Sequence, residues 1–456
     1  MDRKDLADIA SGRLSAEQLA QNFDDVAPPL DRQNALIAAQ RCYYCYDAPC
    51  IQACPTGIDI PSFIRRITTD NLRGAAQDIL GANVLGGMCA RVCPTEILCE
   101  GSCVRNTGES LPVQIGALQR YATDWVFDSN TALFERAAAT GKRVAVVGAG
   151  PAGLSCAHAL ARAGHDVVIF DAKPRPGGLN EYGIAEYKVL DFAAREIDWL
   201  LSLGGIRWEG GRTLGDDLHL SELRRDYDAV FLGLGLTGVN ALGIEGEALA
   251  GVRNAVDFIA DLRQCPDLSR LPVGRRVVVI GGGNTAIDAA VQSKKLGAES
   301  VTLVYRRGSA SMSATWAEQE FARTQGVSVI EWAQPRRLLG DGAVSAIEFE
   351  YTQLDDNGRL LGSGDYFTLA ADSVLKAIGQ TLIAPRANGD GSAVIEIRNG
   401  RIAVNAEFET SVRGVWAGGD CVGGKVDLTV QSVEDGKRAA RAMHARLVGG
   451  NGTTEN

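Results

Sequence analysis

The sequence predicts an α/β protein in which an α-helical, cysteine-rich N-terminal domain precedes two Rossmann-like dinucleotide-binding domains. Three observations predict this class. Residues 144–171 read as a strand, a glycine-rich turn, a helix and a second strand, and residues 277–305 repeat that pattern. Eight of the 11 cysteines lie between residues 42 and 103. A chain of 456 residues is long enough for two or three domains with substantial cores.

The composition is that of an ordinary globular protein and excludes several classes of partner. Hydrophobic residues make up 46% of the chain and charged residues 22%. The net charge of −10 argues against nucleic acid and anionic membrane surfaces as partners. Residues 1–25 lack the apolar core of a secretory signal peptide, and no later stretch is long and apolar enough to span a bilayer. We therefore expect a cytoplasmic protein.

The clustered cysteines form two sets of four with metal-ligand spacing. The sets are Cys42-x2-Cys45-x4-Cys50-x3-Cys54 and Cys89-x3-Cys93-x4-Cys99-x3-Cys103. A proline follows the fourth cysteine of the first set and the second cysteine of the other, and Cys-Pro is a ferredoxin feature. Zinc more often recruits histidine, and no histidine lies in this region. The pattern therefore favours two [4Fe–4S] clusters over zinc or inert buried thiols, but spacing leaves open which cysteines share a cluster.

Helices are expected around these cysteines. Residues 15–40 alternate charged and apolar positions and read as helix, interrupted at Pro28-Pro29. Residues 60–82 and 105–140 also read as helical.

The turn at residues 148–153, GAGPAG, predicts the first dinucleotide site. Gly148 permits the tight turn, Gly150 lets a pyrophosphate approach the backbone, and Gly153 lets the helix lie close to the strand. The helix N-terminus then faces the anion. Asp171 follows the second strand, 18 residues after the last glycine, where it would accept hydrogen bonds from the adenosine ribose hydroxyls. The alternative is a plain turn between strand and helix. The candidate residues are Gly148, Gly150, Pro151, Ala152, Gly153 and Asp171.

A second unit repeats this pattern. Residues 277–286, VVVIGGGNTA, carry the fingerprint Gly281-x-Gly283-x-x-Ala286, with a permitted alanine in third position. The next strand ends in Arg306 and Arg307, where an NAD site usually has an acid. Arginines there could pair with a 2′-phosphate, or form a solvated pair at a strand end. Two dinucleotide units imply two nucleotides, most economically a flavin and a nicotinamide.

The remaining elements return the chain to the first unit. Residues 190–203 read as an amphipathic helix, and residues 230–235 and 374–379 as strands ending in glycine, as expected beside a bound cofactor. Residues 414–424, GVWAGGDCVGG, place Asp420 just after a strand and at the start of a helix, where it could bond the ribityl hydroxyls of FAD or belong to a plain loop. Residues 431–447 read as a long helix, and residues 449–456 as a disordered tail.

Together these motifs resemble a flavin reductase of the glutathione-reductase type that binds two dinucleotides. The cysteine domain narrows the resemblance to the small subunit of bacterial glutamate synthase and to dihydropyrimidine dehydrogenase. The segments CYYCYDAPCIQACPTGIDIPSFI, GMCARVCPTEILCEGSC and GGLNEYGIAEYK are most similar to the flavin subunit (PreT type) of bacterial NAD-dependent dihydropyrimidine dehydrogenase. The resemblance covers essentially the whole chain. It implies an α-helical domain with two [4Fe–4S] clusters at residues 1–138, an FAD-binding domain at 139–240 and 378–456, and an NAD(P)H-binding domain at 241–377.

The resemblance also implies which cysteines share a cluster. One set of ligands is Cys42, Cys45, Cys50 and Cys103, and the other is Cys54, Cys93, Cys99 and Gln119. Gln119 lies 16 residues after the last cysteine, in VQIGALQRY, where the pyrimidine family has its glutamine. Cys89 is then a thiol outside both clusters.

Further residues are implied to contact the nucleotides. Those expected at the flavin are Leu179, Lys188, Asp420 and Thr429. Those expected at the nicotinamide nucleotide are Gly281, Gly282, Gly283, Asn284, Thr285, Arg306, Arg307, Ala377, Ile378 and Gly379. Ser313 stands where the NADPH-using animal enzyme has a further arginine, and the bacterial family prefers NADH. We therefore favour NADH, although Arg306 and Arg307 point to NADPH.

The resemblance implies an electron-input subunit. NAD(P)H would pass hydride to FAD, and the two clusters would carry single electrons onward, with no catalytic side chain required. A separate FMN and iron–sulfur subunit, in a heterotetramer, would reduce uracil and thymine. Two alternatives are an electron-donor subunit of glutamate synthase and a non-enzymatic redox or nucleotide sensor. Gln119 and the stretch LNEYGIAEYK argue against glutamate synthase.

Overall fold

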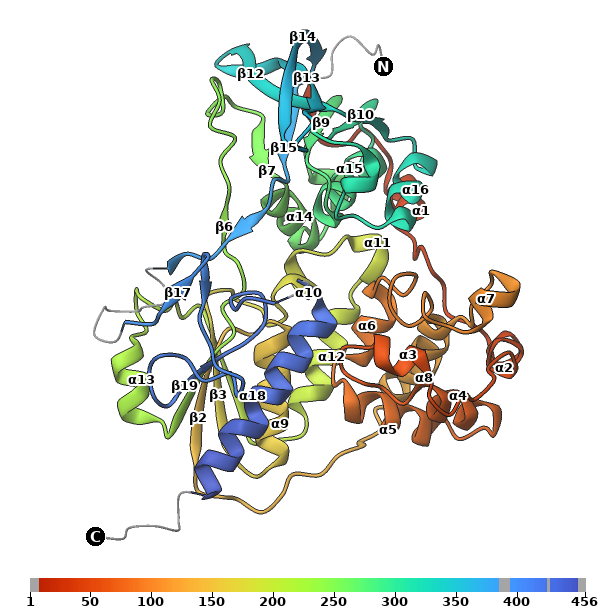
Figure 1. Ribbon diagram of the computed structural model, residues 1–456, viewed down its shortest axis with the longest axis vertical. Helices are drawn as coiled ribbons and strands as arrows, with labels where there is room; N and C mark the ends of the chain where they lie inside the picture. Colours follow the sequence, from red (N-terminus) through yellow and green to blue (C-terminus); the bar gives the residue numbers. More distant parts are fainter. Residues whose placement is uncertain (1–7, 385–393, 425–426, 450–456) are drawn as a thin grey trace. The chain divides into compact units, whose positions relative to one another are not determined.

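The computed structural model describes residues 8–384, 394–424 and 427–449 (Figure 1). Contacts divide the chain into two units. Unit 1 comprises Met1–Val26, Tyr182–Lys188 and Val239–Gln380, and unit 2 comprises Ala27–Glu181, Val189–Gly238 and Thr381–Asn456. Residues 450–456 of the predicted disordered tail lie outside the described residues. Among the described residues, no helix has both the length and the apolar character needed to cross a membrane.

Unit 1 is built on a parallel sheet of five strands. Their order is β11 (Ser328–Ile330), β10 (Ser300–Val304), β9 (Arg276–Ile280), β15 (Ser373–Lys376) and β7 (Val252–Asn254). Helices α14 (Ala255–Gln264), α15 (Asn284–Lys295) and α16 (Trp316–Thr324) accompany the sheet. The central strand β9 is buried from Val277 to Ile280, as expected for a parallel strand covered on both faces. The predicted second dinucleotide unit is therefore present as β9, α15 and β10.

The N-terminal residues and a short later segment belong to unit 1 as well. Strand β1 (Ile9–Ala10) pairs with β8 (Val273–Gly274), and helix α1 (Ala16–Asn22) packs near the turn η2 (Leu268–Arg270). In the segment 182–188, the amide of Ala185 donates to Asp288 on α15. Helix α11 (Glu186–Val189) begins in this segment.

Unit 2 contains a second parallel sheet of five strands. Their order is β19 (Val415–Ala417), β5 (Ala229–Leu232), β2 (Arg143–Val147), β3 (Asp166–Asp171) and β4 (Ile206–Gly210). The accompanying helices are α9 (Pro151–Arg162), α10 (Leu179–Tyr182), α12 (Phe192–Leu201), α13 (Leu220–Asp226) and α18 (Thr429–Gly449). Figure 1 shows the long helix α18 running beside α9, with which it packs closely. The last elements of the chain thus complete the first dinucleotide unit, as predicted.

The remainder of unit 2 is a helical domain that carries the clustered cysteines. Its helices are α2 (Arg32–Gln40), α3 (Pro49–Ala53), α4 (Ile60–Thr68), α5 (Leu72–Ala82), α6 (Gly86–Val92), α7 (Arg105–Glu109) and α8 (Ile115–Ser129). Side chains of Asp31, Asp59 and Asn71 accept backbone N–H groups at the starts of α2, α4 and α5, which explains where these helices begin. Their apolar faces meet in one core that includes Phe63, Ile79 and several cysteines.

Two predicted helices differ from the structure. Residues 60–82 form two helices, because Asp70 takes a left-handed conformation (φ +59°) and Asn71 caps a new helix. Residues 105–140 are helical only in α7 and α8. Ser110 at φ +52° ends α7, and Asn130 at φ +48° ends α8. The break predicted within residues 15–40 is confirmed, since α1 and α2 are separate helices.

An antiparallel sheet of three strands in unit 1 was not predicted. It consists of β12 (Ala333–Asp341), β13 (Ala343–Leu354) and β14 (Leu360–Ala370), in that order. Most of β14 is exposed, so its sequence lacks the alternation of apolar and polar residues that identifies a half-buried strand. The shorter pairs are β6 (Gly238–Val239) with β16 (Gln380–Thr381) and β17 (Ile397–Arg398) with β18 (Arg401–Ile402).

Candidate cofactor-binding sites

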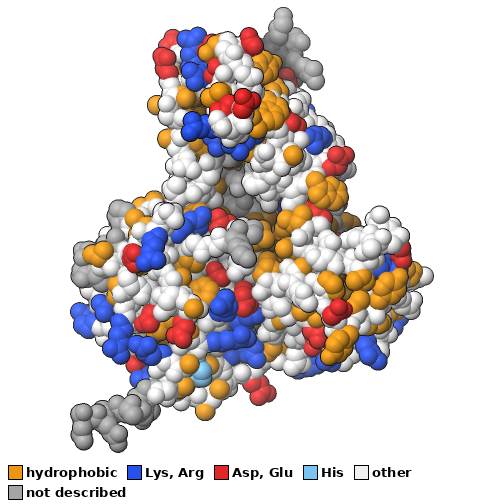
Figure 2. Space-filling view, viewed as in Figure 1, with side chains coloured by type: hydrophobic (Ala, Val, Ile, Leu, Met, Phe, Trp, Pro, Cys, Tyr) orange, Lys and Arg blue, Asp and Glu red, His pale blue; other side chains and the backbone are white. Residues whose placement is uncertain are grey.

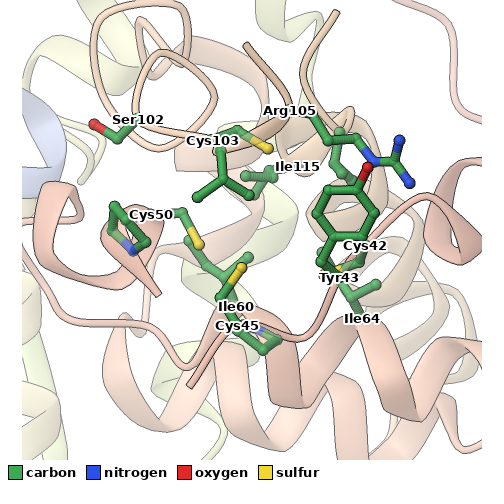
Figure 3. A pocket seen from close by; sticks show the side chains of 14 residues that line it. Cys42, Tyr43, Cys45, Cys50, Ile60, Ile64, Ser102, Cys103, Arg105 and Ile115 are labelled. Carbon is green, nitrogen blue, oxygen red and sulfur yellow. The ribbon is translucent and has the colours of Figure 1, made fainter. Parts of the chain in front are cut away.

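Four thiols line one cavity of the helical domain (Figure 3). Cys42 and Cys45 lie between α2 and α3, Cys50 lies within α3, and Cys103 precedes α7. Apolar residues of α4 and α8, among them Ile60, Ile64 and Ile115, line the same cavity. These four cysteines are the set that the family resemblance assigns to one cluster.

Burial of Cys42 and Cys50 disfavours their thiolate forms. Burial raises the pKa of the Cys50 thiol to about 11, and burial likewise raises the pKa of Cys42. Bound iron would reverse this, because a metal cation deprotonates its thiol ligands. Among residues 8–384, 394–424 and 427–449, no three His, Cys, Asp or Glu side chains converge on a position for one metal ion. Four thiols around one cavity supply the number and type of ligands that a [4Fe–4S] cluster requires.

A second group of thiols lies where α3 and α6 end. Cys54 follows α3, Cys93 follows α6, and Cys99 lies in the turn after it. A hydrogen bond with Cys89 and then burial raise the pKa of Cys93, and the nearby thiols of Cys99 and Cys54 raise it further. Burial also raises the pKa of Cys99. The structure thus brings together the three cysteines assigned to the second cluster, with Cys89 beside them.

Gln119 on helix α8 contacts the start of helix α6, the helix that ends at Cys93. Its side chain is only 7% exposed, and its Nε2 atom donates a hydrogen bond of 2.6 Å to the carbonyl oxygen of Gly86. The amide oxygen Oε1 is the atom with lone pairs for a metal. Residue type and spacing gave no reason to select this glutamine. Its burial is the structural signal, because buried glutamines are uncommon.

The first glycine turn in unit 2 has the shape that a pyrophosphate needs. A Cβ on Gly148, at φ +103°, would lie 2.1 Å from the carbonyl oxygen of Gly233, and one on Gly153 would lie 1.8 Å from that of Gly148. Only glycine therefore fits at these two positions. At Gly150 a Cβ would meet only the Cα of Gly178, at 3.9 Å, so this backbone stays open toward the N-terminus of α9. The turn fits an anionic dinucleotide. Pro151 and Ala152 form the first turn of α9.

Asp171, at the end of β3, is hydrogen-bonded to this turn. One carboxylate oxygen accepts a hydrogen bond of 2.7 Å from the amide of Ala149, and the other accepts one of 2.7 Å from the amide of Lys173. Burial raises the pKa of the Asp171 carboxyl, although these amides oppose the shift. The carboxylate is therefore fixed beside the turn, and a bond to a ribose hydroxyl stays a prediction.

Three of the four residues expected at the flavin lie around the start of α18. Thr429 is the first residue of that helix and donates a hydrogen bond of 3.0 Å to Asn180. Asp420 accepts one of 3.1 Å from Ser432, and burial raises its pKa. Leu179, beside Asn180, is 41% exposed, which leaves an apolar surface for a ring. Asp420 follows β19 as predicted, although α18 begins nine residues later.

Lys188, the fourth, belongs to unit 1. Its ammonium nitrogen lies 2.7 Å from carboxylates of both Asp288 on α15 and Glu318 on α16. Burial lowers the pKa of Lys188, but these two carboxylates outweigh it and the net shift is upward. Tyr187 also hydrogen-bonds Asp288 at 3.3 Å. The side chain expected at the flavin therefore has two fixed partners within unit 1.

The second glycine turn has a comparable form in unit 1. A Cβ on Gly281, at φ +147°, would lie 2.2 Å from the carbonyl oxygen of Ala377, and one on Gly282 would lie 2.6 Å from the ring of Tyr305. Helix α15 follows Gly283 with no side-chain cap. Asn284 in its first turn has a buried Oδ1 atom with no hydrogen-bond partner. Thr285 is also half-buried there. The uncapped N–H groups of α15 fit a nucleotide phosphate, and the Oδ1 atom of Asn284 can accept a hydrogen bond from a hydroxyl or amide of the nucleotide.

The other residues expected at the nicotinamide nucleotide follow neighbouring strands. Arg306 and Arg307 come after β10, and residues 377–379 (Ala377, Ile378 and Gly379) come after β15; both strands pair with β9. They therefore meet at the carboxyl edge of the sheet, where open α/β sheets bind ligands. Arg306 is exposed, and the Nε atom of Arg307 is buried without a hydrogen-bond partner. A Cβ on Gly283 would lie 3.1 Å from the hydroxyl of Ser313, which places Ser313 at this turn.

Glu196 and Lys437 were missed by sequence reasoning. Lys437 is half-buried and Glu196 is buried, and both side chains hydrogen-bond backbone groups of the cysteine domain. Burial raises the pKa of the Glu196 carboxyl to about 8. No local pattern could select them, because their partners are far away in the sequence.

Two protein families match this chain, one in its N-terminal part and one over the remainder. Residues 19–131 match the family described as dihydropyrimidine dehydrogenase domain II, 4Fe-4S cluster, and residues 142–436 match the pyridine nucleotide-disulphide oxidoreductases. The glutamate synthase [NADPH] small chain of Halomonas elongata is 34% identical, over 94% of each chain. The NAD-dependent dihydropyrimidine dehydrogenase subunit PreT of Salmonella typhimurium is 36% identical, over 94% of this chain and 98% of its own.

A solved structure confirms the fold. FprA from Mycobacterium tuberculosis, in complex with NADPH, has a TM-score of 0.56 and 21% identity, covering 68% of this chain and 85% of its own. The predicted class, an α/β protein with a helical iron–sulfur domain and two dinucleotide-binding units, is thereby confirmed. The chain is an oxidoreductase that belongs to the pyridine nucleotide-disulphide oxidoreductase family, in the group with an N-terminal 4Fe-4S domain that includes the PreT subunits and the glutamate synthase small chain.

Proposed function

We propose that this chain is the electron-input subunit of an NAD-dependent dihydropyrimidine dehydrogenase. When bound, FAD would accept hydride from NAD(P)H, and two [4Fe–4S] clusters would carry the electrons onward singly. The observation that carries the proposal is the buried amide of Gln119, which bonds the start of helix α6, while that helix ends at Cys93 near Cys54 and Cys99. The relative named PreT, 36% identical over nearly its full length, supports the same assignment.

The chain's own residues bind and orient the groups. The open backbone at Gly150 and the N-terminus of α9 would hold the FAD pyrophosphate, with Asp420 and Thr429 at the ribityl side. The uncapped N-terminus of α15 and the Oδ1 atom of Asn284 would hold the nicotinamide nucleotide. Hydride transfer needs orientation and exclusion of water rather than a protein acid or base, so we propose no catalytic side chain.

NADH is the proposed reductant. Ser313 offers one neutral hydroxyl at the second glycine turn, whereas a 2′-phosphate is best held by several cations. Arg306 and Arg307 are close by in sequence, so discrimination against NADPH is expected to be incomplete. Flavin reduction in rapid mixing tests this: a higher kcat/KM with NADPH would overturn the preference.

The partner is proposed to be a separate FMN and iron–sulfur subunit that reduces uracil and thymine, in a heterotetramer. An acceptor must approach a cluster, and the first thiol set lies near the surface, with Tyr43, Tyr44 and Tyr46 exposed around it. Tyr46 is fully exposed. Figure 2 shows hydrophobic side chains gathered over this helical part of unit 2. Exposed tyrosines are typical of protein interfaces. Both subunits would work in the cytoplasm, where thiols stay reduced.

The test is anaerobic affinity purification of the chain from its own cells, followed by reconstitution. Co-purification of an FMN-containing subunit, and NADH-dependent reduction of uracil by the two chains together, are expected. Uracil turnover by this chain alone would contradict the proposal. So would a complex in which the FMN subunit reduces no pyrimidine.

A second candidate is the electron-donor subunit of glutamate synthase. The small chain of Halomonas elongata, 34% identical over 94% of both chains, favours it. A large amidotransferase-type partner would establish this alternative, with the cofactor sites unchanged. A sensor would instead show negligible steady-state reduction of artificial acceptors by NADH.

A further inference from the structure

Two titratable side chains of unit 2, Lys437 and Glu196, hydrogen-bond the backbone where α5 ends and α6 begins. We call residues 82–88 the α5–α6 corner. Lys437 on α18 donates hydrogen bonds to the carbonyl oxygens of Ala82, at 2.7 Å, and Thr56, at 3.2 Å. Its side chain is 14% exposed. Lys437 therefore satisfies the last carbonyl of α5, a group that the helix itself leaves without a partner.

Glu196 on α12 holds the other side of the corner. Its carboxylate accepts a hydrogen bond of 2.7 Å from the amide of Gly87 and one of 3.2 Å from the amide of Met88. Glu196 is fully buried, and helix α6 has no side-chain cap from its own N-cap residue. A cation thus lies at the C-terminus of α5, as the helix dipole favours, and a buried carboxyl group accepts the free amides at the N-terminus of α6.

The corner in turn fixes ligands assigned to the second cluster. The carbonyl of Gly86 accepts the amide proton of Gln119, which orients that side chain. Helix α6 ends at Cys93. On the Lys437 side, the Thr56 hydroxyl lies 3.3 Å from the Cys54 sulfur. Displacement of the corner would therefore move three of the four proposed ligands.

Helix α18 also reaches the first glycine turn. A Cβ on Gly436 would lie 2.1 Å from the carbonyl oxygen of Ala152, in the first turn of α9. Lys437 is the next residue. Helix α18 also begins beside Asp420, which Ser432 contacts. Helix α18 therefore contacts both the dinucleotide turn and the α5–α6 corner.

Helix α12 packs tightly at the corner as well. The guanidinium of Arg91 lies 3.5 Å from the centre of the Phe192 ring, and Phe192 stacks edge-on against Phe127. A Cβ on Gly87 would lie 2.5 Å from Phe192. This close packing excludes water and lets the buried Glu196 hold one geometry.

We propose that Lys437 and Glu196 are positioning residues. They fix the distance between the site formed by Cys54, Cys93, Cys99 and Gln119 and the dinucleotide turn of unit 2. They thereby set the rate of electron transfer between the groups held at these two places, because that rate falls steeply with distance. This inference rests on the proposed function, since it needs FAD and a cluster at the two sites.

The test uses the full-length holoprotein with Lys437→Met, Lys437→Arg, Glu196→Ala and Glu196→Gln. Arg441→Met and Asp198→Asn are matched controls, because these exposed residues lie on the same two helices. In stopped-flow mixing with NADH, flavin reduction should keep its wild-type rate in all variants. Cluster reduction should slow at least tenfold in Lys437→Met and Glu196→Ala, and both conservative variants should recover most of it.

Two readouts do not depend on turnover. Amide hydrogen exchange at residues 87 and 88 should accelerate in Glu196→Ala and stay slow in Glu196→Gln, which keeps an acceptor oxygen. The electron paramagnetic resonance signal of one cluster should shift while that of the other stays unchanged. If Glu196→Ala does not fold, Lys437→Met and the two conservative variants still decide the question.

Wild-type rates and spectra in Lys437→Met and Glu196→Ala would overturn the proposal. Equal slowing in Arg441→Met or Asp198→Asn would overturn it too, because any charge change on these helices would then act alike. None of these measurements uses a partner subunit or a pyrimidine, so their failure is distinguishable from failure of the proposed function.

Discussion

The Nε2 atom of Gln119 donates a hydrogen bond of 2.6 Å to the carbonyl oxygen of Gly86. This bond fixes which end of the amide is which, because only the nitrogen can donate to a carbonyl. The oxygen is then the end available to iron. The amide of this buried glutamine thus has a free oxygen for the ligand role that we propose, which cysteine spacing could not show.

Replacing Gln119 should remove one cluster and spare the other. In Gln119→Leu the amide oxygen and the bond to Gly86 are both lost, so we expect the iron and sulfide content to fall by half. Gln114→Leu is a control with the same change at an exposed position just before α8. Full iron content in anaerobically purified Gln119→Leu would contradict the ligand assignment.

Cys89→Ser should keep both clusters. Cys89 is buried and hydrogen-bonds Cys93, but it stands outside the two proposed ligand sets. Serine retains a hydrogen-bonding group of similar size, so iron content should match the wild type. Cys93→Ser is the matched comparison, and it should lose cluster iron. Loss of a cluster in Cys89→Ser would refute the assignment.

Lys188→Met should destabilise unit 1 strongly. The substitution leaves Asp288 and Glu318 without their shared cation, and breaking such a buried pair costs about 3–5 kcal/mol. The measurement is denaturant unfolding followed by a probe in unit 1. Lys142→Met, which breaks the more exposed pair with Asp228, should cost less than about 1 kcal/mol. Equal losses in the two variants would contradict the buried role of Lys188.

Glu196 should make the protein less stable at higher pH. Its pKa is raised by burial from 4.5 to about 8, so between these values the folded state binds a proton that the unfolded state has lost. The free energy of unfolding therefore falls as the pH rises through this range. The amides of Gly87 and Met88 and the charge of Arg91 oppose the shift, and Asp124 adds to it.

The measurement is the thermal midpoint from pH 5 to pH 9. Glu196→Gln removes the titrating group and keeps an acceptor, so its midpoint should decline less across this range than that of the wild type. Asp198→Asn, an exposed change on the same helix, should follow the wild type. Parallel curves for wild type and Glu196→Gln would show that the carboxyl does not titrate in this range.

Ser313→Arg should shift the nucleotide preference toward NADPH. The serine hydroxyl lies at the second glycine turn, and a guanidinium there could bond a 2′-phosphate. One charge-assisted hydrogen bond is worth about 1.5–3 kcal/mol, so the ratio of kcat/KM for NADPH over NADH should rise at least tenfold. Ser311→Arg, two residues earlier and exposed, is the control. An unchanged ratio would place the 2′-phosphate elsewhere.

Local sequence determined much of this protein. The two glycine turns, the strands before them and the helices after them were predictable, because tight turns and close helix packing demand glycine at particular positions. The two cysteine sets and the α/β class followed from spacing and repetition in the same way. The helices predicted over residues 60–82 and 105–140 are too long. Residues in the left-handed conformation, such as Asp70 and Ser110, end the helices earlier, and few residue types signal that conformation in the sequence.

Only the tertiary structure decided which distant residues meet. It grouped Cys103 with Cys42, Cys45 and Cys50, placed Lys188 between Asp288 and Glu318, and formed the antiparallel sheet β12–β14. It also brought Lys437 and Glu196 to the α5–α6 corner. Each of these contacts joins positions that no short pattern links, since burial and pairing over long separations depend on how whole elements pack. The sequence by itself determined the cofactor motifs, and packing decided how their ligands are assembled and held.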